Sequence, residues 1–526
     1  MNRWHRYWFD DGGRSALAVI RIAVAICVLM TLLDVSALPQ LVARRAVYRP
    51  VGIWMLLGAT PPPEALVTVL WAIAGGSTAA MLLGVWSRAA TATSFVSAVA
   101  LTSLAYSGSA TWSHSYNVVF LAHLALLGGR CGDALSIDAR LRGPINLARG
   151  YQWSVRLVQA AVALMFITAC YHKLRAGGFT LAWATSDNLR HQLLARYDLV
   201  QLPRPAIVDW LLAESWRYRT AACLNLVSQA APLLAIVFVR RPKVRAVVAV
   251  LFLVEGIAID QLMGLPNPQW LPLAAVFVDW DHVIARFRAP PAPTGTYTPP
   301  RRVHVFIVAF LVYDVVVSIV PKLDHRLGTY PFSAFQMFAV VRASPPWDEH
   351  RPYSMYGDSY AIDGALDPAV QRYYDHAYRF MYMQTDPARL EPRLATILSH
   401  IQTNHPAARA TRLRHHLAMF VVPAYPGPAR FDKRLVAVTA ELAPDGLHTV
   451  LGAATATSVE LRPRGVDAST AQLVYYAAHE STPIALAATR TGNTFTLAQP
   501  LPARAEHVVA IIGDTRWLVW SRRTRK

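Results

Sequence analysis

The chain has 526 residues, of which 54% are hydrophobic and 16% are charged, and several apolar runs approach the length that spans a lipid bilayer. This composition is typical of a polytopic membrane protein with room for a further domain. The net charge of +19 does not indicate nucleic-acid binding, because the basic residues form short clusters at the ends of apolar runs, where they act as topology signals and contacts for lipid headgroups.

Hydropathy predicts nine membrane spans. The first, "SALAVIRIAVAICVLMTLLDV", has no small-residue cleavage site behind it, so we expect a retained span and not a removed signal peptide. The fourth and eighth are short, and each could be re-entrant or tilted, so the expected fold is an all-α transmembrane bundle of about eight to nine spans. The expected spans are residues 15–35, 64–86, 89–107, 116–129, 153–170, 220–239, 244–264, 270–283 and 303–320.

The orientation of the bundle follows from the Lys/Arg bias of its short loops. Basic clusters lie at residues 130–149, 240–245 and 286–302, and with nine spans all three fall on the side of the N-terminus. A cluster at residues 44–49 disagrees. The sequence therefore predicts a multi-pass protein of the plasma (inner) membrane with a cytoplasmic N-terminus and an extracytoplasmic region from Lys322 onward.

The last third of the chain has a soluble character. Residues 367–419 show helical spacing, whereas from Arg434 onward alternating apolar runs such as "RLVAVTAEL" and "EHVVAIIGD" are separated by turn residues. We expect an α+β region that ends in a small antiparallel β domain of the sandwich type. The three expected parts are a transmembrane bundle over residues 1–320, a juxtamembrane and helical region over 321–433, and the β domain over 434–526.

Neither a disulfide framework nor a metal site is expected. The four cysteines all precede the last third of the chain. His400, His405 and the "RHH" of residues 414–416 do not have the i, i+4 spacing of metal ligands on a helix, and no acidic residues accompany them. We therefore interpret these histidines as solvated surface residues. The aromatic run "GTYPFSAFQMFAVV", residues 328–341, either lies on the membrane surface or packs within a domain.

Ionisable residues inside apolar spans are costly and are therefore candidates for function. Arg21 lies in the first expected span. Its guanidinium could equally form a structural salt bridge, anchor on backbone carbonyls or contact a ligand. Glu255 lies deep in the seventh span and needs a partner, for which Arg21 is one choice. Asp260 points about 140° away from Glu255 around the helix, so the two carboxylates do not form an acid/base pair.

His114 in "TWSHSYNVVF" and Lys173 in "CYHKL" are expected at the outer ends of consecutive spans, where the two side chains can approach each other. A histidine can relay protons near neutral pH, and a lysine partly removed from water can act as a base. The simpler alternative is that Lys173 snorkels to the lipid headgroups and His114 caps a loop.

The stretches "WSHSYNVVFLAHLALLGGRCGDALSIDARLRGP" and "RLVQAAVALMFITACYHKL" resemble the vitamin K-dependent γ-glutamyl carboxylase family and the wider bacterial set of HTTM (horizontally transferred transmembrane) domains. The matching features are a His-Ser-Tyr that opens a span, a Ser-x-Asp at Ser136 and Asp138, and a closing Lys-Leu. The resemblance implies that Lys173 deprotonates a reduced vitamin K or other quinol and that His114 assists carboxylation. The residues that we expect to contact this cofactor are Arg21, Tyr171, His172 and Glu255.

The resemblance also implies a reaction. In the family, the deprotonated quinol reacts with O2, the resulting base removes the γ-proton of a glutamate in an exported polypeptide, and the carbanion captures CO2. Here His172 replaces the first lysine of the family motif, and "VEGIAIDQLMGLPNPQW" stands where a later family span carries a His and an Asn. Two alternatives therefore stay open: a quinone-linked oxidoreductase or lipid-processing enzyme without carboxylation, and a non-catalytic membrane anchor for the outer domain.

Overall fold

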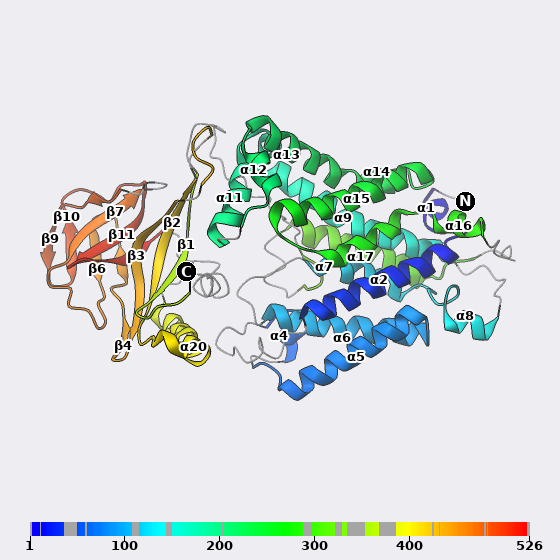
Figure 1. The fold of residues 1–526 in the computed structure, drawn as a ribbon, viewed down its shortest axis with the longest axis horizontal. Coiled ribbons are helices and arrows are strands. Elements are labelled where there is room, and N and C mark those ends of the chain that lie inside the picture. Colours follow the sequence, from blue (N-terminus) through cyan, green and yellow to red (C-terminus); the bar gives the residue numbers. More distant parts are fainter. Residues whose placement is uncertain are drawn as a thin grey trace. The chain divides into compact units, whose positions relative to one another are not determined.

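The protein forms two compact units, one helical and one rich in strands (Figure 1). The first unit comprises Met1–Leu193 and Arg204–Arg342, and the second comprises Leu194–Pro203 and Ala343–Lys526. A helical bundle followed by a strand-rich region is the fold class that the sequence predicts. The computed structural model describes residues 3–10, 12–35, 50–57, 60–107, 115–143, 150–200, 203–287, 297–320, 329–333, 353–367, 386–422, 425–430, 432–477, 480 and 482–522.

Seven helices in the described part of the chain are long and apolar enough to cross a membrane. They coincide with seven predicted spans, because an apolar segment in lipid can satisfy its backbone groups only as a helix. One of them is interrupted at Pro232, which has no N–H to donate. The helices are α2 (Arg14–Asp34), α5 (Glu64–Leu83), α6 (Ser87–Ser107), α9 (Gln152–Ala176), α13 with α14 (Ser215–Ala230 and Pro232–Val237), α15 (Pro242–Met263) and α17 (Arg301–Ile319).

Hydrogen bonds between elements define two ends of this bundle. At the first, called end A, Asp281 accepts a hydrogen bond of 2.9 Å from the backbone N–H of Ser15, at the start of α2. At the second, called end B, Tyr116 donates a hydrogen bond to Asp34, the last residue of α2. The described N-terminal residues, including α1 (Arg3–Trp8), therefore lie at end A.

Two shorter elements also run between the ends, namely α7 (Asn117–Leu127) and the 3-10 helix η3 (Pro268–Phe277). Trp270, early in η3, donates to the carbonyl of Ser115 at end B (2.6 Å), and the carbonyl of Phe277 accepts from Arg245 at end A (3.2 Å). A 3-10 helix rises about 2 Å per residue, so ten residues cover about 20 Å. With α7 and η3, the described residues make nine passages between the two ends.

The eighth predicted span, residues 270–283, is therefore not one transmembrane α-helix. It divides into η3 and α16 (Trp280–Ala285), because Pro272 interrupts α-helical bonding and Asp279 caps the helix that follows through the N–H of His282. The remaining short helices before α17 are α4 (Trp54–Leu57), α8 (Ile137–Arg142), α10 (Ala182–Thr185), α11 (Asn188–Val200) and α12 (Ala206–Leu212). Residues of α11 from Leu194 onward belong to the second unit.

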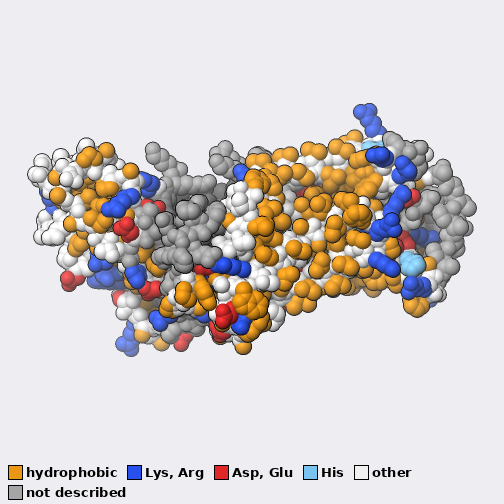
Figure 2. Space-filling view, turned by 90° about the horizontal axis from the view of Figure 1, so that it is seen from above, with side chains coloured by type: hydrophobic (Ala, Val, Ile, Leu, Met, Phe, Trp, Pro, Cys, Tyr) orange, Lys and Arg blue, Asp and Glu red, His pale blue; other side chains and the backbone are white. Residues whose placement is uncertain are grey.

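The surface of the bundle is apolar between its ends. Figure 2 shows hydrophobic side chains covering this face and Lys and Arg side chains gathered at end A. Val69, Leu224 and Val254 are among the large hydrophobic residues that are more than half exposed. This apolar belt, together with the helix lengths, makes the chain a multi-pass membrane protein.

The described part of the aromatic run, residues 329–333, packs on the bundle. Tyr330 is buried, and its hydroxyl donates to the Thr102 hydroxyl of α6 at 2.8 Å. The ring of Phe332 lies 4.7 Å from that of Tyr313 in α17. For these residues the prediction of packing within the protein is correct, and the alternative of a position on the membrane surface is not.

The second unit contains two sheets with a shared core. The larger sheet has eight strands in the order β1-β2-β3-β12-β11-β7-β8, with β4 on β3, and the smaller has the order β5-β6-β10-β9. Val459 and Phe495 of the smaller sheet pack in one hydrophobic cluster with Tyr475, Val508 and Trp517 of the larger. This is the sandwich that the alternating pattern predicts, but β12 pairs with β3 in parallel, so the domain is not wholly antiparallel. The parallel pair arises because the last strand inserts between β3 and β11.

The larger sheet begins before Arg434. Helical spacing predicts helices over residues 367–419, but the described residues there form α20 (Pro387–Asn404), the short η4 (Pro406–Ala408) and then strand β2, which pairs with both β1 and β3. The strands are β1 (Tyr353–Ile362), β2 (Leu413–Val422), β3 (Asp432–Ala443), β4 (Gly446–His448), β5 (Gly452–Ala454), β6 (Ser458–Leu461), β7 (Gln472–Ala477), β8 (Ile484–Ala485), β9 (Ala488–Thr491), β10 (Thr494–Leu497), β11 (Ala505–Ile512) and β12 (Thr515–Ser521).

Two histidines of the "RHH" stretch are buried. His415 and His416 lie in β2, between two neighbouring strands, and are 0% and 9% exposed. Burial, reinforced by the nearby His415, Arg414 and Lys433, lowers the pKa of His416 to about 4. The expectation that these two are solvated surface residues is wrong.

Candidate functional site

Lys173 lies inside the bundle. Helix α9 continues beyond the predicted end at Cys170 to Ala176, so Lys173 stays in the helix, and its side chain is 1% exposed. A snorkelling lysine would keep its ammonium group in the headgroup region. The snorkelling interpretation is therefore wrong for Lys173.

Three groups surround the amine of Lys173. Its Nζ donates hydrogen bonds to Asn225 Oδ1 (2.5 Å) and Gln229 Oε1 (2.9 Å), both on α13. It also lies 4.2 Å from the ring centroid of Trp183, on α10, within the range of a cation–π contact. An ammonium group has three N–H donors, so each has a partner.

The same two carboxamides connect Lys173 to Glu255 on α15. Asn225 Nδ2 and Gln229 Nε2 donate to Glu255 Oε1 at 2.5 and 2.9 Å, and Ser228 Oγ donates to Oε2 at 2.5 Å. Residues 225, 228 and 229 share one face of α13, because their spacing is one helical turn. Five side chains from three helices thus form one polar cluster inside the bundle.

A cavity of about 300 Å³ lies against this cluster. Leu224 and Val227 of α13 and Val254 of α15 line it, and they are 63%, 60% and 55% exposed on the outside of the bundle. The cavity therefore reaches the apolar surface, where lipid chains lie in a membrane. Among its described lining residues, Lys173 and Glu255 are the only ones with charged side chains.

The structure does not bring the other residues expected near Lys173 into its cavity, as far as they are described. His114 lies outside the described residues. His172 Nε2 donates a hydrogen bond of 2.6 Å to the carbonyl of Ser318 on α17, and the ring of Tyr171 lies 6.0 Å from that of Phe179. Adjacent helical residues point about 100° apart, so neither Tyr171 nor His172 lines the cavity with Lys173.

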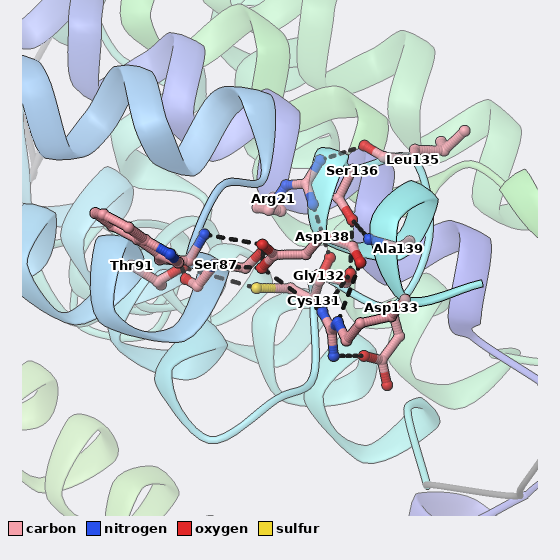
Figure 3. A network of polar contacts seen from close by, with 12 residues as sticks. Arg21, Ser87, Thr91, Cys131, Gly132, Asp133, Leu135, Ser136, Asp138 and Ala139 are labelled. Carbon is pink, nitrogen blue, oxygen red and sulfur yellow. Dashed lines mark hydrogen bonds and ion pairs between the residues drawn. The ribbon is translucent and has the colours of Figure 1, made fainter. Parts of the chain in front are cut away.

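Arg21 is a structural anchor near end A. Its guanidinium donates to the carbonyls of Cys131 (3.1 Å) and Leu135 (2.6 Å), and its side chain is 0% exposed (Figure 3). The predicted pairing of Arg21 with Glu255 is wrong, because Arg21 holds the loop before α8 and Glu255 binds Asn225, Ser228 and Gln229.

The Ser-x-Asp signature ties the same loop to α6 (Figure 3). Ser136 Oγ caps α8 by accepting from the N–H of Ala139 (2.9 Å). Asp138 accepts from the N–H groups of Trp86 (3.0 Å) and Ser87 (2.8 Å) and from the Ser87 hydroxyl (2.8 Å). Partial burial raises the pKa of Asp138, but these hydrogen bonds outweigh it, and the pKa lies below its usual value.

The predicted site residues included neither Trp183 nor the three α13 residues Asn225, Ser228 and Gln229. The segment "CLNLVSQAAPLL" nevertheless carried a usable signal. Asn225, Ser228 and Gln229 interrupt an apolar run at helical spacing, and polar residues inside a span usually face the bundle interior and bind one another. Within the described residues, no group of His, Cys, Asp and Glu could hold a metal ion.

A comparison with protein families shows what part of the chain is similar to a known family. Residues 9–258 match the family model of the HTTM domain, and this range includes Lys173, Asn225 and Glu255 as well as the Ser-x-Asp loop. No curated protein and no solved structure matches the chain. Residues 9–258 of this multi-pass membrane protein are therefore similar to an HTTM domain.

Proposed function

We propose that the protein is a membrane-embedded enzyme that binds a lipid-soluble quinol in the cavity beside Lys173 and uses Lys173 as the base for a quinol hydroxyl. The observation that carries this proposal is the position of a buried lysine at the polar end of an apolar cavity that reaches the lipid-facing surface. A volume of about 300 Å³ is within the range of small-molecule pockets. Such a cavity fits a ring-sized headgroup with an apolar tail.

The residues of the chain have separate tasks in this proposal. Asn225 and Gln229 fix the position of Lys173 Nζ, and the walls of Leu224, Val227 and Val254 exclude water from it. An ammonium nitrogen has no lone pair, so Nζ can receive a proton from a ligand only in its neutral form, after one of its own three protons has left. When bound, a reduced quinone supplies electrons to O2 and, in the reaction that the sequence resemblance implies, the strong base needed for carboxylation.

We propose γ-carboxylation of glutamate in an exported polypeptide as the overall reaction. The His-Ser-Tyr and Lys-Leu matches and the HTTM domain support this choice. His114 remains the group proposed to assist the carboxylation step. A glutamate C–H bond would be replaced by a bond to CO2, with O2 as the oxidant and the quinol as the reductant.

Quinol oxidation without carboxylation is the second candidate. It is favoured by the cavity itself, whose described lining residues include Lys173 and Glu255 but no histidine. Co-expression with an exported glutamate-containing peptide separates the two candidates. Mass spectrometry that finds CO2 added to glutamate supports the carboxylase, and quinol consumption with an unmodified peptide supports the oxidoreductase.

Lys173→Met should lower O2-dependent oxidation of a reduced naphthoquinone by at least about 100-fold, because it removes the base but keeps most of the side-chain volume. Lys173→Arg should be equally inactive, since its guanidinium keeps the charge but cannot act as a base. The measurement uses the full chain in lipid nanodiscs. Lys243→Met, at an exposed position of end A, is the control and should keep wild-type turnover. Wild-type turnover in Lys173→Met would refute the proposed role.

We propose that end A faces the cytoplasm of a cell whose plasma (inner) membrane holds the bundle. The Lys and Arg side chains gathered at end A support this orientation (Figure 2). Alkaline phosphatase fused after Val320, beyond α17, should be active, because the enzyme needs an oxidising compartment for its disulfides. A fusion after Arg241, between α14 and α15, should be inactive. The opposite pattern of activities would reverse the orientation.

A further inference from the structure

Lys173 and Glu255 form one electrically balanced cluster through two carboxamides. Asn225 and Gln229 each turn their oxygen toward the Lys173 amine and their NH2 group toward Glu255 Oε1. Both bridges therefore have the same polarity, with acceptors toward a cation and donors toward an anion. This arrangement fits an ammonium group at one end and a carboxylate at the other.

The surroundings of Glu255 also fit a carboxylate. Its two oxygens accept three hydrogen bonds, from Asn225, Gln229 and Ser228, and its side chain is 4% exposed. An ionised carboxyl group is a pure acceptor, so it matches this set of donors. A single charge inside a membrane bundle is costly, and a balancing charge reduces that cost.

We propose that Glu255 is a specificity-determining residue of the cavity, which makes the cavity neutral as a whole and so selects neutral hydroxyl-bearing lipids over lipid anions. The proposal rests on the proposed function, because it concerns the ligand of the same cavity. A fatty-acid carboxylate bound at Lys173 would add an unbalanced negative charge beside Glu255 in a medium of low dielectric constant. A lipid with a neutral hydroxyl adds no charge.

Two photoreactive probes with the same chain test this selectivity. One is palmitic acid with a diazirine in its chain, and the other is the matching fatty alcohol, each added at pH 8 to the full-length protein in phosphatidylcholine nanodiscs. Mass spectrometry measures the yield of labelled α13 and α15 peptides. The wild type should be labelled more by the alcohol than by the acid.

Glu255→Gln removes the negative charge and keeps the side-chain volume. Labelling by the acid should rise about tenfold or more, because Lys173 then lacks its balancing charge, while labelling by the alcohol stays within about twofold. The double variant Lys173→Met/Glu255→Gln removes both charges and should restore the preference for the alcohol. Glu214→Gln removes an exposed carboxylate just before α13 and is the matched control, which should label like the wild type.

Two results would overturn the inference. The first is unchanged acid labelling in Glu255→Gln while alcohol labelling shows an intact cavity. The second is a double variant that takes up the acid as strongly as Glu255→Gln. Either result leaves the proposed function intact if Lys173→Met still abolishes quinol turnover, and the selectivity can hold even if no turnover is found.

Discussion

Gly84→Ala should destabilise the bundle by about 2–5 kcal/mol, which combines left-handed backbone strain with overpacking. Gly84 ends α5 with a φ of +71°, a conformation that favours glycine. A Cβ there would lie 2.3 Å from Ser136 Cβ, 2.9 Å from Ser136 Cα and 2.7 Å from a guanidinium nitrogen of Arg21. The methyl group would therefore push apart the end of α5 and the loop that carries the Ser-x-Asp signature.

Thermal unfolding of the purified protein in detergent measures this loss. Gly76→Ala, in the middle of α5, is the matched control because a Cβ there meets nothing within 4 Å. Alanine is favoured over glycine inside a helix by about 0.5–1 kcal/mol, so the control should be as stable as the wild type or slightly more stable. Equal melting temperatures for the two alanine variants would show that the contact at Gly84 is not tight.

Arg21→Ala should cost about 3–5 kcal/mol, because it leaves buried polar groups without their partner. The carbonyls of Cys131 and Leu135 would each lose a donor, and the volume of a fully buried arginine would be left empty. The same unfolding measurement applies. Arg88→Ala, at an exposed position in α6, should change the melting temperature little and serves as the control.

Arg21→Ala also separates anchoring from cofactor binding. Arg21 does not line the Lys173 cavity, so the variant that remains folded should keep the wild-type ratio of alcohol to acid labelling. A loss of stability with unchanged selectivity assigns Arg21 to the loop. A changed ratio in a protein of normal stability would instead assign it to the ligand.

The positions of the long helices could be predicted because an apolar segment surrounded by lipid can satisfy its backbone hydrogen bonds only as a helix. Hydropathy gives the depth of a residue in the membrane, but it does not give the direction of its side chain. For this reason Arg21 and Glu255 were correctly placed inside spans and wrongly placed together. The partners of Lys173 were missed because Asn225 and Gln229 reach it from a separate helix, and Trp183 from a further short one.

Strand pairing explains where the second unit differs from the structure that the sequence predicts. The runs after Arg434 alternate and were recognised as strands. Strand β2 was not, because Arg414 and two histidines give it the composition of a solvated surface segment. Its burial depends on β1 and β3, which pair with it on either side, and β1 lies far from it in the sequence. Such non-local pairing cannot be deduced from a local pattern.

The 3-10 passage η3 affects how the protein is assembled in the membrane. A ten-residue segment that contains Pro272 is too short to be inserted by its own hydrophobicity. Its side chains Trp270, Leu273 and Phe277 are buried in the core of the bundle, so η3 has a stable place only after its neighbouring helices have assembled. We therefore expect α15 and α17 to be inserted first and η3 to pack against α2 and α15 later, so the final topology depends on folding within the membrane as well as on insertion during synthesis.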